Sequence, residues 1–351
     1  MTALSERIRE AAAHPKPRRD LRNCGTCKER MLAKMRIDVV AQRAAGFEGR
    51  IVVVMPVRNE GVKAVETVRQ LRAMKAPGTH LHFAVVDDGS TDRCCEIFKP
   101  ARDCTVWRNV EPMGQGVARN LGVLAQEADA YLSIDAHIEI GPHDAEKLAV
   151  LAEESGGVVG CLSGSLANRK NFRGCGHRWE RKPNPVGRAI MGSVWNYHRV
   201  DTRALIPVHR HAGACYAFTR KTYDRFGGFG ETRGLYGFFE RDLAVRCRFT
   251  GVPQLVYPDA LAWHWYRKNR PYRMTGLGYW QGYVESLRTT FRPDVWKRVF
   301  EPAARRTNDS RLHDPVLDWM LRDPRLLILQ ADFERKKVVS DEEVLGWLGL
   351  T

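Results

Sequence analysis

Short apolar runs alternate with amphipathic stretches between residues 50 and 155. The run RIVVVMPV at 50–57 is rich in β-branched residues, which is typical of a strand that is buried on both faces. Residues 62–75 carry an apolar stripe at helical spacing, and the Pro-Gly pair at 77–78 ends that helix. The same alternation predicts strands at 81–87 and 131–138 and helices at 114–128 and 142–155. Buried strands that alternate with helices indicate a parallel sheet, so we expect an α/β fold.

Charged residues follow three of these strands where each strand ends, at 58–60, 87–92 and 135–137. Core strands have no structural need to end in acids, and ligands of parallel sheets bind at the carboxyl ends of the strands. The stretch YLSIDAHIEI adds two metal-ligand types, Asp135 and His137, at a spacing of two. If the strand continues through both residues, their side chains lie on one face. This edge of the sheet is therefore the candidate binding site.

Six motifs occur in a fixed order along the chain. They are VVVMPVRNE (52–60), VVDDGSTD (85–92), GQGVARNLG (114–122), SIDAH (133–137), GACYAFTRKTYDRFGGF (213–229) and YGFFERDLAVR (236–246). Together they resemble a glycosyltransferase with the GT-A fold, close to the family 2 pattern. The resemblance implies a Rossmann-like mixed sheet flanked by helices, in a domain at 49–265 with a nucleotide half (49–155) and an acceptor half (156–265). Helical extensions are expected at 1–48, which is basic, and at 266–351, which is basic and aromatic.

The resemblance also implies a nucleotide-sugar donor, with a UDP-sugar preferred. The donor-binding residues that it implies are Pro56, Arg58, Glu60, Asp87, Asp88, Arg119 and Asp135. The two neighbouring aspartates would recognise the nucleobase or the ribose, because a carboxylate can accept from the uracil N–H or from ribose hydroxyls. The alternative for Arg58 and Arg119 is a structural role, in which they form surface ion pairs with Glu60 or Asp92.

Family 2 members usually carry Asp-x-Asp at the end of this strand, where a carboxylate binds a divalent cation on the diphosphate. Here His137 takes the place of the second acid. Asp-x-His is similar to the polypeptide N-acetylgalactosaminyltransferases, which also supply a later histidine, and His264 in LAWHWYR is the candidate. One oxygen ligand from Asp135 and two imidazole nitrogens favour Mn²⁺ or another transition ion over Mg²⁺. The alternative for His264 is a histidine packed between Trp263 and Trp265.

The resemblance places the catalytic acids in FERDL. In inverting family members an acid at the position of Glu240 deprotonates the acceptor hydroxyl, and Asp242 matches the second acid. The Asp-x-His relatives retain configuration and lack an acid at this position, so the two halves of the resemblance imply opposite stereochemistry. Glu240 favours inversion. The alternative is a helix-surface arrangement in which these acids pair with Arg241 and Arg246.

Two further features concern the same half of the chain. The Gly-rich segment 225–237 predicts a mobile loop on the acceptor side. His209 and His211 precede the acceptor-side strand and are candidates for contact with the donor phosphates. The Gln-x-x-Arg-Trp motif of processive synthases is absent from the sequence, so we expect transfer of single sugars.

The formal net charge is +15, and the excess is uneven. Eleven Lys and Arg residues face four acids between residues 267 and 311. Such a field attracts polyanions, although a generic solubilising charge is the alternative. Because Trp and Tyr are interleaved with the basic residues at 263–311, we expect a nucleic-acid acceptor, such as a hydroxymethylated base in DNA. A protein or cell-envelope acceptor is the alternative.

No apolar stretch of transmembrane length and no apolar centre of a signal peptide occur in the sequence, so we expect a cytoplasmic enzyme. Cys24 and Cys27 form a CxxC without a second pair, which favours free thiols over a zinc site. A non-catalytic nucleotide-sugar binding module is a further alternative, but it would not need both Asp135 and Glu240. A nucleotidyltransferase would need a Gly-rich phosphate loop after the first strand. The segment MPVRNEG at this place is acidic and poor in glycine by comparison, so this alternative is disfavoured.

Overall fold

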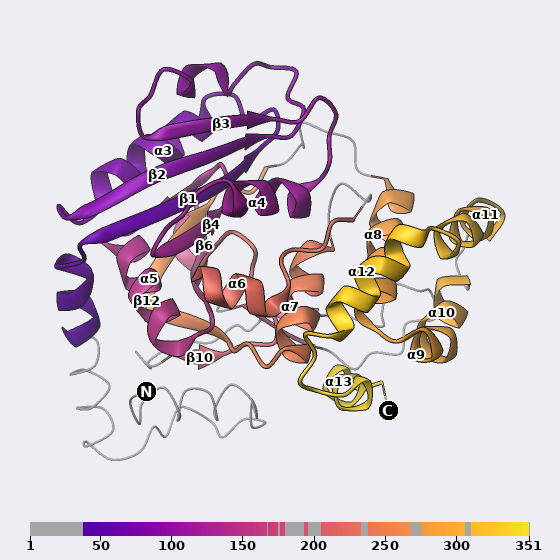
Figure 1. Cartoon of the computed structure of the whole chain (residues 1–351). Coiled ribbons are helices and arrows are strands. Elements are labelled where there is room, and N and C mark those ends of the chain that lie inside the picture. Colours follow the sequence, from indigo (N-terminus) through magenta and orange to yellow (C-terminus); the bar gives the residue numbers. More distant parts are fainter. Residues whose placement is uncertain are drawn as a thin grey trace, which may run out of the picture.

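The structure is a computed structural model. It describes residues 38–166, 168–174, 176–179, 193–195, 205–232, 238–267, 275–305 and 310–350. A large mixed sheet has helices on both faces, and a group of helices from the end of the chain packs beside it (Figure 1). Cys24 and Cys27 lie outside the described residues, as does most of the expected extension at 1–48; residues 38–45 are helical.

The sheet orders its strands β10-β12-β6-β11-β4-β1-β2-β3, with β5 paired to β12 and β7 paired to β6. The strands are β1 (Gly49–Val57), β2 (Thr79–Asp87), β3 (Cys104–Arg108), β4 (Ala130–Ile134), β5 (Ile138–Ile140), β6 (Val158–Ser165), β7 (Asn168–Gly174), β10 (Ile206–Pro207), β11 (Cys215–Phe218) and β12 (Gln254–His264). β8 (His177–Trp179) and β9 (Ser193–Trp195) form a separate pair. β1 runs parallel to β2 and β4, and β11 runs antiparallel to β4 and β6. The predicted α/β class and mixed sheet are confirmed.

Alternate residues of β1 bury themselves in two different layers. Ile51 and Val53 belong to the apolar cluster that includes α3 (Lys63–Met74) and α5 (Asp144–Ser155). Val52 and Val54 belong to the cluster on the other face. The helices of that second layer are α4 (Gln115–Leu124), α6 (Arg220–Phe226) and α7 (Phe239–Phe249). A strand that is buried on both faces has a continuous run of apolar residues, and the run at 50–57 therefore predicted β1 correctly.

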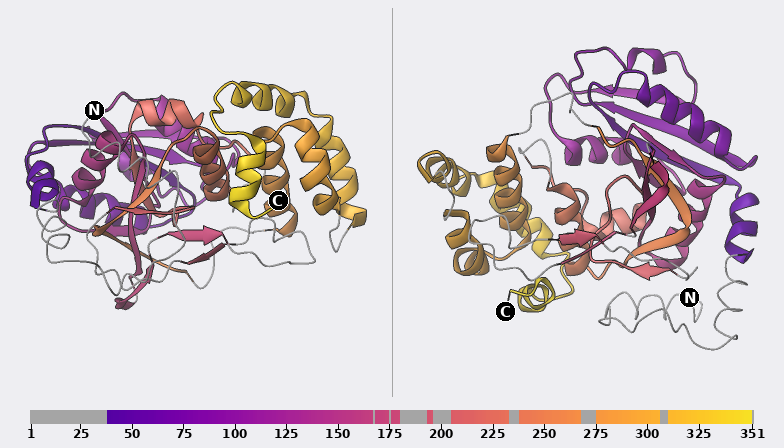
Figure 2. Two further views of the ribbon diagram at one scale, coloured as in Figure 1. Left: turned by 90° about the horizontal axis from the view of Figure 1, so that it is seen from below. Right: turned by 180° about the vertical axis from the view of Figure 1, so that it is seen from behind.

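The helices of the C-terminal segment form one apolar cluster with α7. They are α8 (Gly276–Thr290), α9 (Pro293–Val295), the π-helix η3 (Trp296–Phe300), α10 (Glu301–Arg305), α11 (Ser310–Leu321), α12 (Pro324–Glu334) and α13 (Asp341–Leu348). Their buried core includes Trp296 and Phe300 and continues into Val245 and Phe249 of α7. Figure 2 shows the C-terminal helices, in orange to yellow, grouped together on one side of the molecule. The predicted helical character of 266–351 therefore holds for its described residues, and this segment supports the helix that carries Glu240.

Candidate functional site

Strand pairing brings Asp135, His137 and His264 together although they are far apart in sequence. β4 ends at Ile134, and the chain turns before it enters β5. β5 pairs with β12 so that Ile138 lies opposite His264, and the backbone N–H of Trp265 donates to the His137 carbonyl at 3.1 Å. The expectation that Asp135 and His137 share the face of one continuous strand is wrong, because both lie in this turn. The three side chains converge because β5 pairs with β12, and not because alternate residues of one strand share a face.

The three side chains offer one ligand atom each, and these atoms lie within 4.8 Å of one another. The two imidazoles face each other with 3.1 Å between their Nε2 atoms, and Nε2 of His264 is 3.3 Å from Oδ2 of Asp135. Atoms that share an ion at about 2.1 Å are roughly 3.0–3.4 Å apart for coordination angles between octahedral and tetrahedral. The donor set and its spacing therefore fit a divalent cation, and His264 is not merely packed between tryptophans.

Arg119 stabilises Asp135 from inside the protein. Its side chain is 0% exposed, its Nη2 is 3.1 Å from Oδ1 of Asp135, and its Nε donates to Ser133 at 2.9 Å. Burial acts to raise the pKa of Asp135, but the hydrogen bond from His264 and the charge of Arg119 outweigh it and hold the pKa at about 2. The surface-pairing alternative is therefore wrong for Arg119, which contacts the candidate metal ligand directly.

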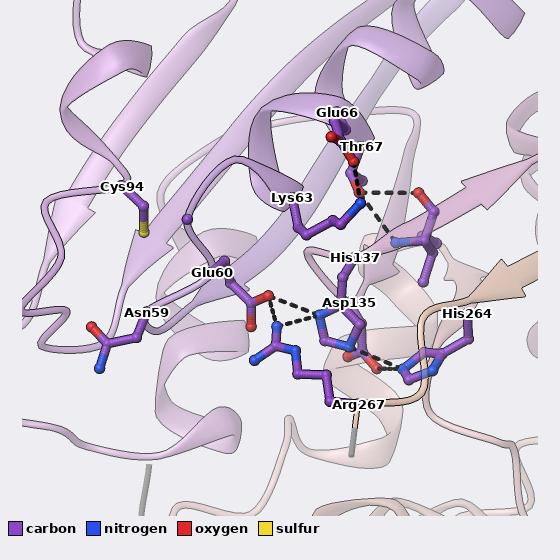
Figure 3. Close-up of polar contacts among 12 residues, drawn as sticks. Asn59, Glu60, Lys63, Glu66, Thr67, Cys94, Asp135, His137, His264 and Arg267 are labelled. Atoms are coloured by element: carbon purple, nitrogen blue, oxygen red, sulfur yellow. Dashed lines mark hydrogen bonds and ion pairs between the residues drawn. The ribbon is translucent and has the colours of Figure 1, made fainter. Parts of the chain in front are cut away.

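His137 is held on its other side by Glu60, as Figure 3 shows. Oε2 of Glu60 lies 3.0 Å from Nδ1 of His137, and Arg267 contacts the same carboxylate and approaches Nδ1 to 3.1 Å. Burial lowers the pKa of His137, so the imidazole is neutral and available as a ligand. Neither contact was predicted from the sequence, which placed Glu60 beside the nucleoside and Arg267 in the basic segment expected to attract a polyanion.

Asp87 and Asp88 are both buried and hydrogen-bonded to the protein itself. Asp87 accepts from the Ser90 N–H and from Arg108 at 2.6 Å. Asp88 accepts from the side chain of Asn109 and from the backbone N–H groups of Met113 and Gly114, at 2.7–2.9 Å. These contacts tie the ends of β2 and β3 to the start of α4. Their predicted contact with a nucleobase or ribose stays a prediction.

Pro56 and Arg58 lie at the end of β1, partly exposed, on the same edge of the sheet as Asp87. Neighbouring loops fasten this region: Asn59 accepts from the backbone N–H of Thr91 at 2.7 Å, and Asp92 accepts from that of Gly61. The candidate nucleotide residues therefore occupy one continuous edge, as the parallel strands predicted.

Glu240 and Asp242 lie in the first turn of α7 but in different surroundings. Asp242 is fully buried, receives Arg246 at 2.6 Å and accepts from the Ser286 hydroxyl at 2.6 Å. Glu240 packs against Gly213, whose φ is +84° and where a Cβ would lie 2.6 Å from Oε1 of the glutamate. Burial raises the pKa of Glu240, and the charge of Arg210 opposes that shift. Both acids are thus more than a helix-surface pair, and Asp242 has the contacts of a structural residue.

The part of the Gly-rich segment that the structure describes, up to residue 232, packs closely. A Cβ on Gly230 would collide with the carboxylate of Asp242, and one on Gly116 in α4 would collide with the Gly230 carbonyl. Glycine is needed at both positions because α4 and α7 each come too close to residue 230 to leave room for a Cβ. The predicted mobility concerns residues 233–237 as well, which lie outside the described residues.

His211 has no surface to offer to a ligand. It is 2% exposed and stacks on Tyr216 with ring centroids 5.6 Å apart, so its predicted contact with donor phosphates is wrong. The ring of His209 lies 5.4 Å from that of Trp347 in α13. The two histidines that looked equivalent in sequence therefore belong to two different packing layers.

Burial of His211 predicts a loss of stability in acid. Burial lowers its pKa to about 3, whereas an unfolded histidine titrates near ~6.5. Between the folded and the unfolded pKa, the unfolded chain binds a proton at this histidine that the folded chain does not bind. The free energy of unfolding therefore decreases as the pH is lowered from ~6.5 towards the folded pKa. The loss from this group is about 2 kcal/mol between pH 6.5 and 5. Denaturant unfolding of wild type and His211→Phe at both values should show a shallower pH dependence in the variant; equal slopes would contradict it.

Among the described residues, no helix is both long enough and apolar enough to cross a membrane.

A family model described as glycosyl transferase family 2 matches residues 52–223. The match begins in β1 and ends in α6, so it contains Asp135 and His137 and stops before Glu240 and His264. One curated relative is the undecaprenyl-phosphate 4-deoxy-4-formamido-L-arabinose transferase of Pseudomonas savastanoi pv. phaseolicola (strain 1448A / Race 6). It is 28% identical over 144 residues, which cover 38% of this chain and 39% of the relative.

Among solved structures, GalNAc-T7 with UDP, GalNAc and Mn²⁺ is similar with a TM-score of 0.61 and 15% identity, covering 85% of this chain and 56% of that chain. A mannosyltransferase from Pyrobaculum calidifontis with GDP-Man and Mn²⁺ is 17% identical and covers 99% of this chain and 95% of its own, at a TM-score of 0.46. The likeness to GalNAc-T7 confirms the GT-A fold. The chain spans 39% of the curated relative and little more than half of GalNAc-T7.

Proposed function

We propose that the protein transfers a single sugar from a nucleotide-sugar donor to a hydroxyl group of an acceptor, and the match of residues 52–223 to the glycosyl transferase family 2 model supports this. The observation that carries the proposal is the convergence of Asp135, His137 and His264 at the carboxyl edge of the sheet. Their oxygen and nitrogen atoms have the chemistry and spacing of a divalent cation site. A bound cation supplies charge neutralisation for the leaving nucleoside diphosphate.

The proposed donor is a UDP-sugar and the proposed cation is Mn²⁺. GalNAc-T7, which shares the fold, was solved with UDP and Mn²⁺, which supports both choices. Two imidazole ligands favour a transition ion over Mg²⁺. Pro56, Arg58, Asp87 and Asp88 lie along the same edge of the sheet and are the proposed contacts of the nucleoside.

Glu240 is the proposed general base. It lies at the start of α7, where its carboxylate is close enough to Asp135 for the charge of that residue to raise its pKa further. A base with a raised pKa accepts a proton from an acceptor hydroxyl more effectively near neutral pH. Asp242 supports it indirectly, since its pairing with Arg246 and Ser286 fixes the first turn of α7 against α8.

The acceptor is open between two classes. The basic and aromatic segment 263–311 favours hydroxymethylated DNA, but the descriptions of the curated relative and of GalNAc-T7 name no nucleic acid. The curated relative is named for undecaprenyl phosphate, so a cell-envelope or protein acceptor stands beside DNA in the test.

A donor screen tests the proposal. Purified protein with Mn²⁺ is offered UDP-, GDP- and dTDP-sugars, and nucleotide release is followed alone and with hydroxymethylated duplex DNA, a protein extract, or vesicles that contain undecaprenyl phosphate. Release from one donor class that an acceptor stimulates supports the transferase. Stimulation only by DNA, and its decline with rising salt, selects the nucleic-acid acceptor. Binding of no donor with or without Mn²⁺ would overturn the proposal.

A further inference from the structure

The two imidazoles at the candidate cation site have different support, and this asymmetry suggests a role for a third side chain. Nδ1 of His137 is 3.0 Å from the Glu60 carboxylate. Nδ1 of His264 is buried and, among the described residues, has no hydrogen-bond partner. A metal-binding histidine usually donates its second ring N–H to a carboxylate or carbonyl, which fixes the tautomer and the ring orientation. By this criterion, only His137 of the two histidines has its tautomer and ring orientation fixed for metal binding.

The contacts around Glu60 decide which nitrogen of His137 carries the proton. A carboxylate only accepts, whereas a guanidinium only donates. The 3.0 Å contact between Nδ1 of His137 and Oε2 of Glu60 is a hydrogen bond only if Nδ1 carries the proton, and Arg267 can donate to the same carboxylate, so Glu60 accepts from both neighbours. His137 is then protonated on Nδ1, and its unprotonated Nε2 faces His264 at 3.1 Å. His264 in turn donates from Nε2 in the metal-free state, toward His137 or Asp135.

We propose that Glu60 is a positioning residue for the cation site: it keeps His137 in the tautomer that presents a free Nε2 to the metal. This inference rests on the cation site proposed above and assigns Glu60 a role other than nucleoside contact. The side chain suits that role because it is only 7% exposed, and the loop that carries it is tied to Thr91 and Asp92.

The inference predicts a reversal when Glu60 is removed. In Glu60→Ala, Arg267 remains beside Nδ1, and because a guanidinium can only donate, Nδ1 accepts and the proton moves to Nε2. That proton then points into the cation site. Supporting residues of this kind typically contribute about 10–100-fold to metal affinity. We expect a loss of that size in Glu60→Ala and a smaller one in Glu60→Gln, whose amide oxygen can still accept.

Two measurements on the full chain test the inference. Mn²⁺ affinity is measured from the EPR signal of the free ion, and the tautomer of His137 is read from ¹⁵N shifts of histidine-labelled, metal-free protein. Glu66→Gln is the matched control, because that carboxylate is exposed and pairs with Lys63 at 2.6 Å on the same side of the fold. We expect wild type and control to show Nδ1–H and equal affinity, and Glu60→Ala to show Nε2–H and weaker binding.

Each other outcome has a distinct meaning. If wild type binds Mn²⁺ and Glu60→Ala binds equally well, the positioning role is wrong. Weaker binding with an unchanged tautomer would also overturn it, because Glu60 would then act through its charge alone. If wild type binds no divalent cation, the cation site itself fails. Should Glu60→Ala not fold, Glu60→Gln and Glu60→Asp give the same comparison, since the latter keeps the charge but withdraws the carboxylate from Nδ1.

Discussion

Glu240→Gln should lose sugar transfer by about 10²–10⁴-fold, the usual contribution of a general base, while the protein still binds donor and cation. The substitution keeps the shape of the side chain against Gly213 and removes its ability to take a proton. Because burial raises the pKa of Glu240, the neutral amide suits this environment and the fold should stay intact. Donor binding by calorimetry and transfer to acceptor, measured on the same preparation, separate the two effects.

The anomeric configuration of the product gives a second readout for Glu240. Deprotonation of the acceptor by this residue predicts an inverted product, which NMR of the purified glycoside identifies. Asp242→Asn is a useful comparison, since Asp242 is paired with Arg246 and should affect stability more than the configuration of the product. Full activity of Glu240→Gln, or a retained anomer, would remove Glu240 from the role of base.

Asp135→Ala should abolish metal-dependent activity and also destabilise the fold. The substitution removes the only carboxylate of the candidate cation site and the ion-pair partner of Arg119, which is 0% exposed. Removal of one partner of a fully buried pair typically costs about 3–5 kcal/mol, and Asp135 itself is 23% exposed. Arg119 keeps its hydrogen bond to Ser133 and its contact with the Phe239 ring, so we expect the lower end of that range, about 3 kcal/mol, in denaturant unfolding.

The double variant Arg119→Met/Asp135→Ala separates these two roles. In this variant the buried guanidinium of Arg119 is removed as well. Most of the lost unfolding free energy should return, because an apolar replacement of a buried pair is often close to neutral. Cation binding should stay absent. A single Asp135→Ala variant as stable as wild type would contradict the buried pair, and one that keeps Mn²⁺-dependent turnover would contradict the cation site.

The sequence predicted the sheet where its strands are continuous apolar runs, as in β1 and β2, and located the functional edge from the acids that follow them. It identified Asp135, His137 and His264, but for a wrong geometric reason. Their convergence depends on the pairing of β5 with β12, and strand register between segments that are more than 120 residues apart leaves no local pattern. His264 was identified from the resemblance to Asp-x-His glycosyltransferases, because the alternation of side chains along a strand gives no information about a residue so far away in sequence.

Burial of charged residues was the second feature that the sequence did not reveal. Arg119 lies on α4 in a motif that reads equally well as a surface helix, and only the tertiary structure encloses it between Ser133, Asp135 and the Phe239 ring. The contact between Glu60 and His137 joins two strand ends that the parallel topology predicts to be close, so it was within reach of the sequence argument. The packing of the C-terminal helices on α7 depends on Val245 and Phe249, whose i, i+4 spacing indicates one buried helix face but not which element covers it.

The most direct test of the account is a calorimetric titration of UDP into wild-type protein with Mn²⁺, repeated after chelation with EDTA and with His264→Ala. If Asp135, His137 and His264 hold a cation that neutralises the diphosphate, chelation should weaken binding at least tenfold, which corresponds to about 1.4 kcal/mol. His264→Ala with Mn²⁺ should then resemble chelated wild type. Equal affinity in all three experiments would show that the donor binds without this site and would contradict the central claim.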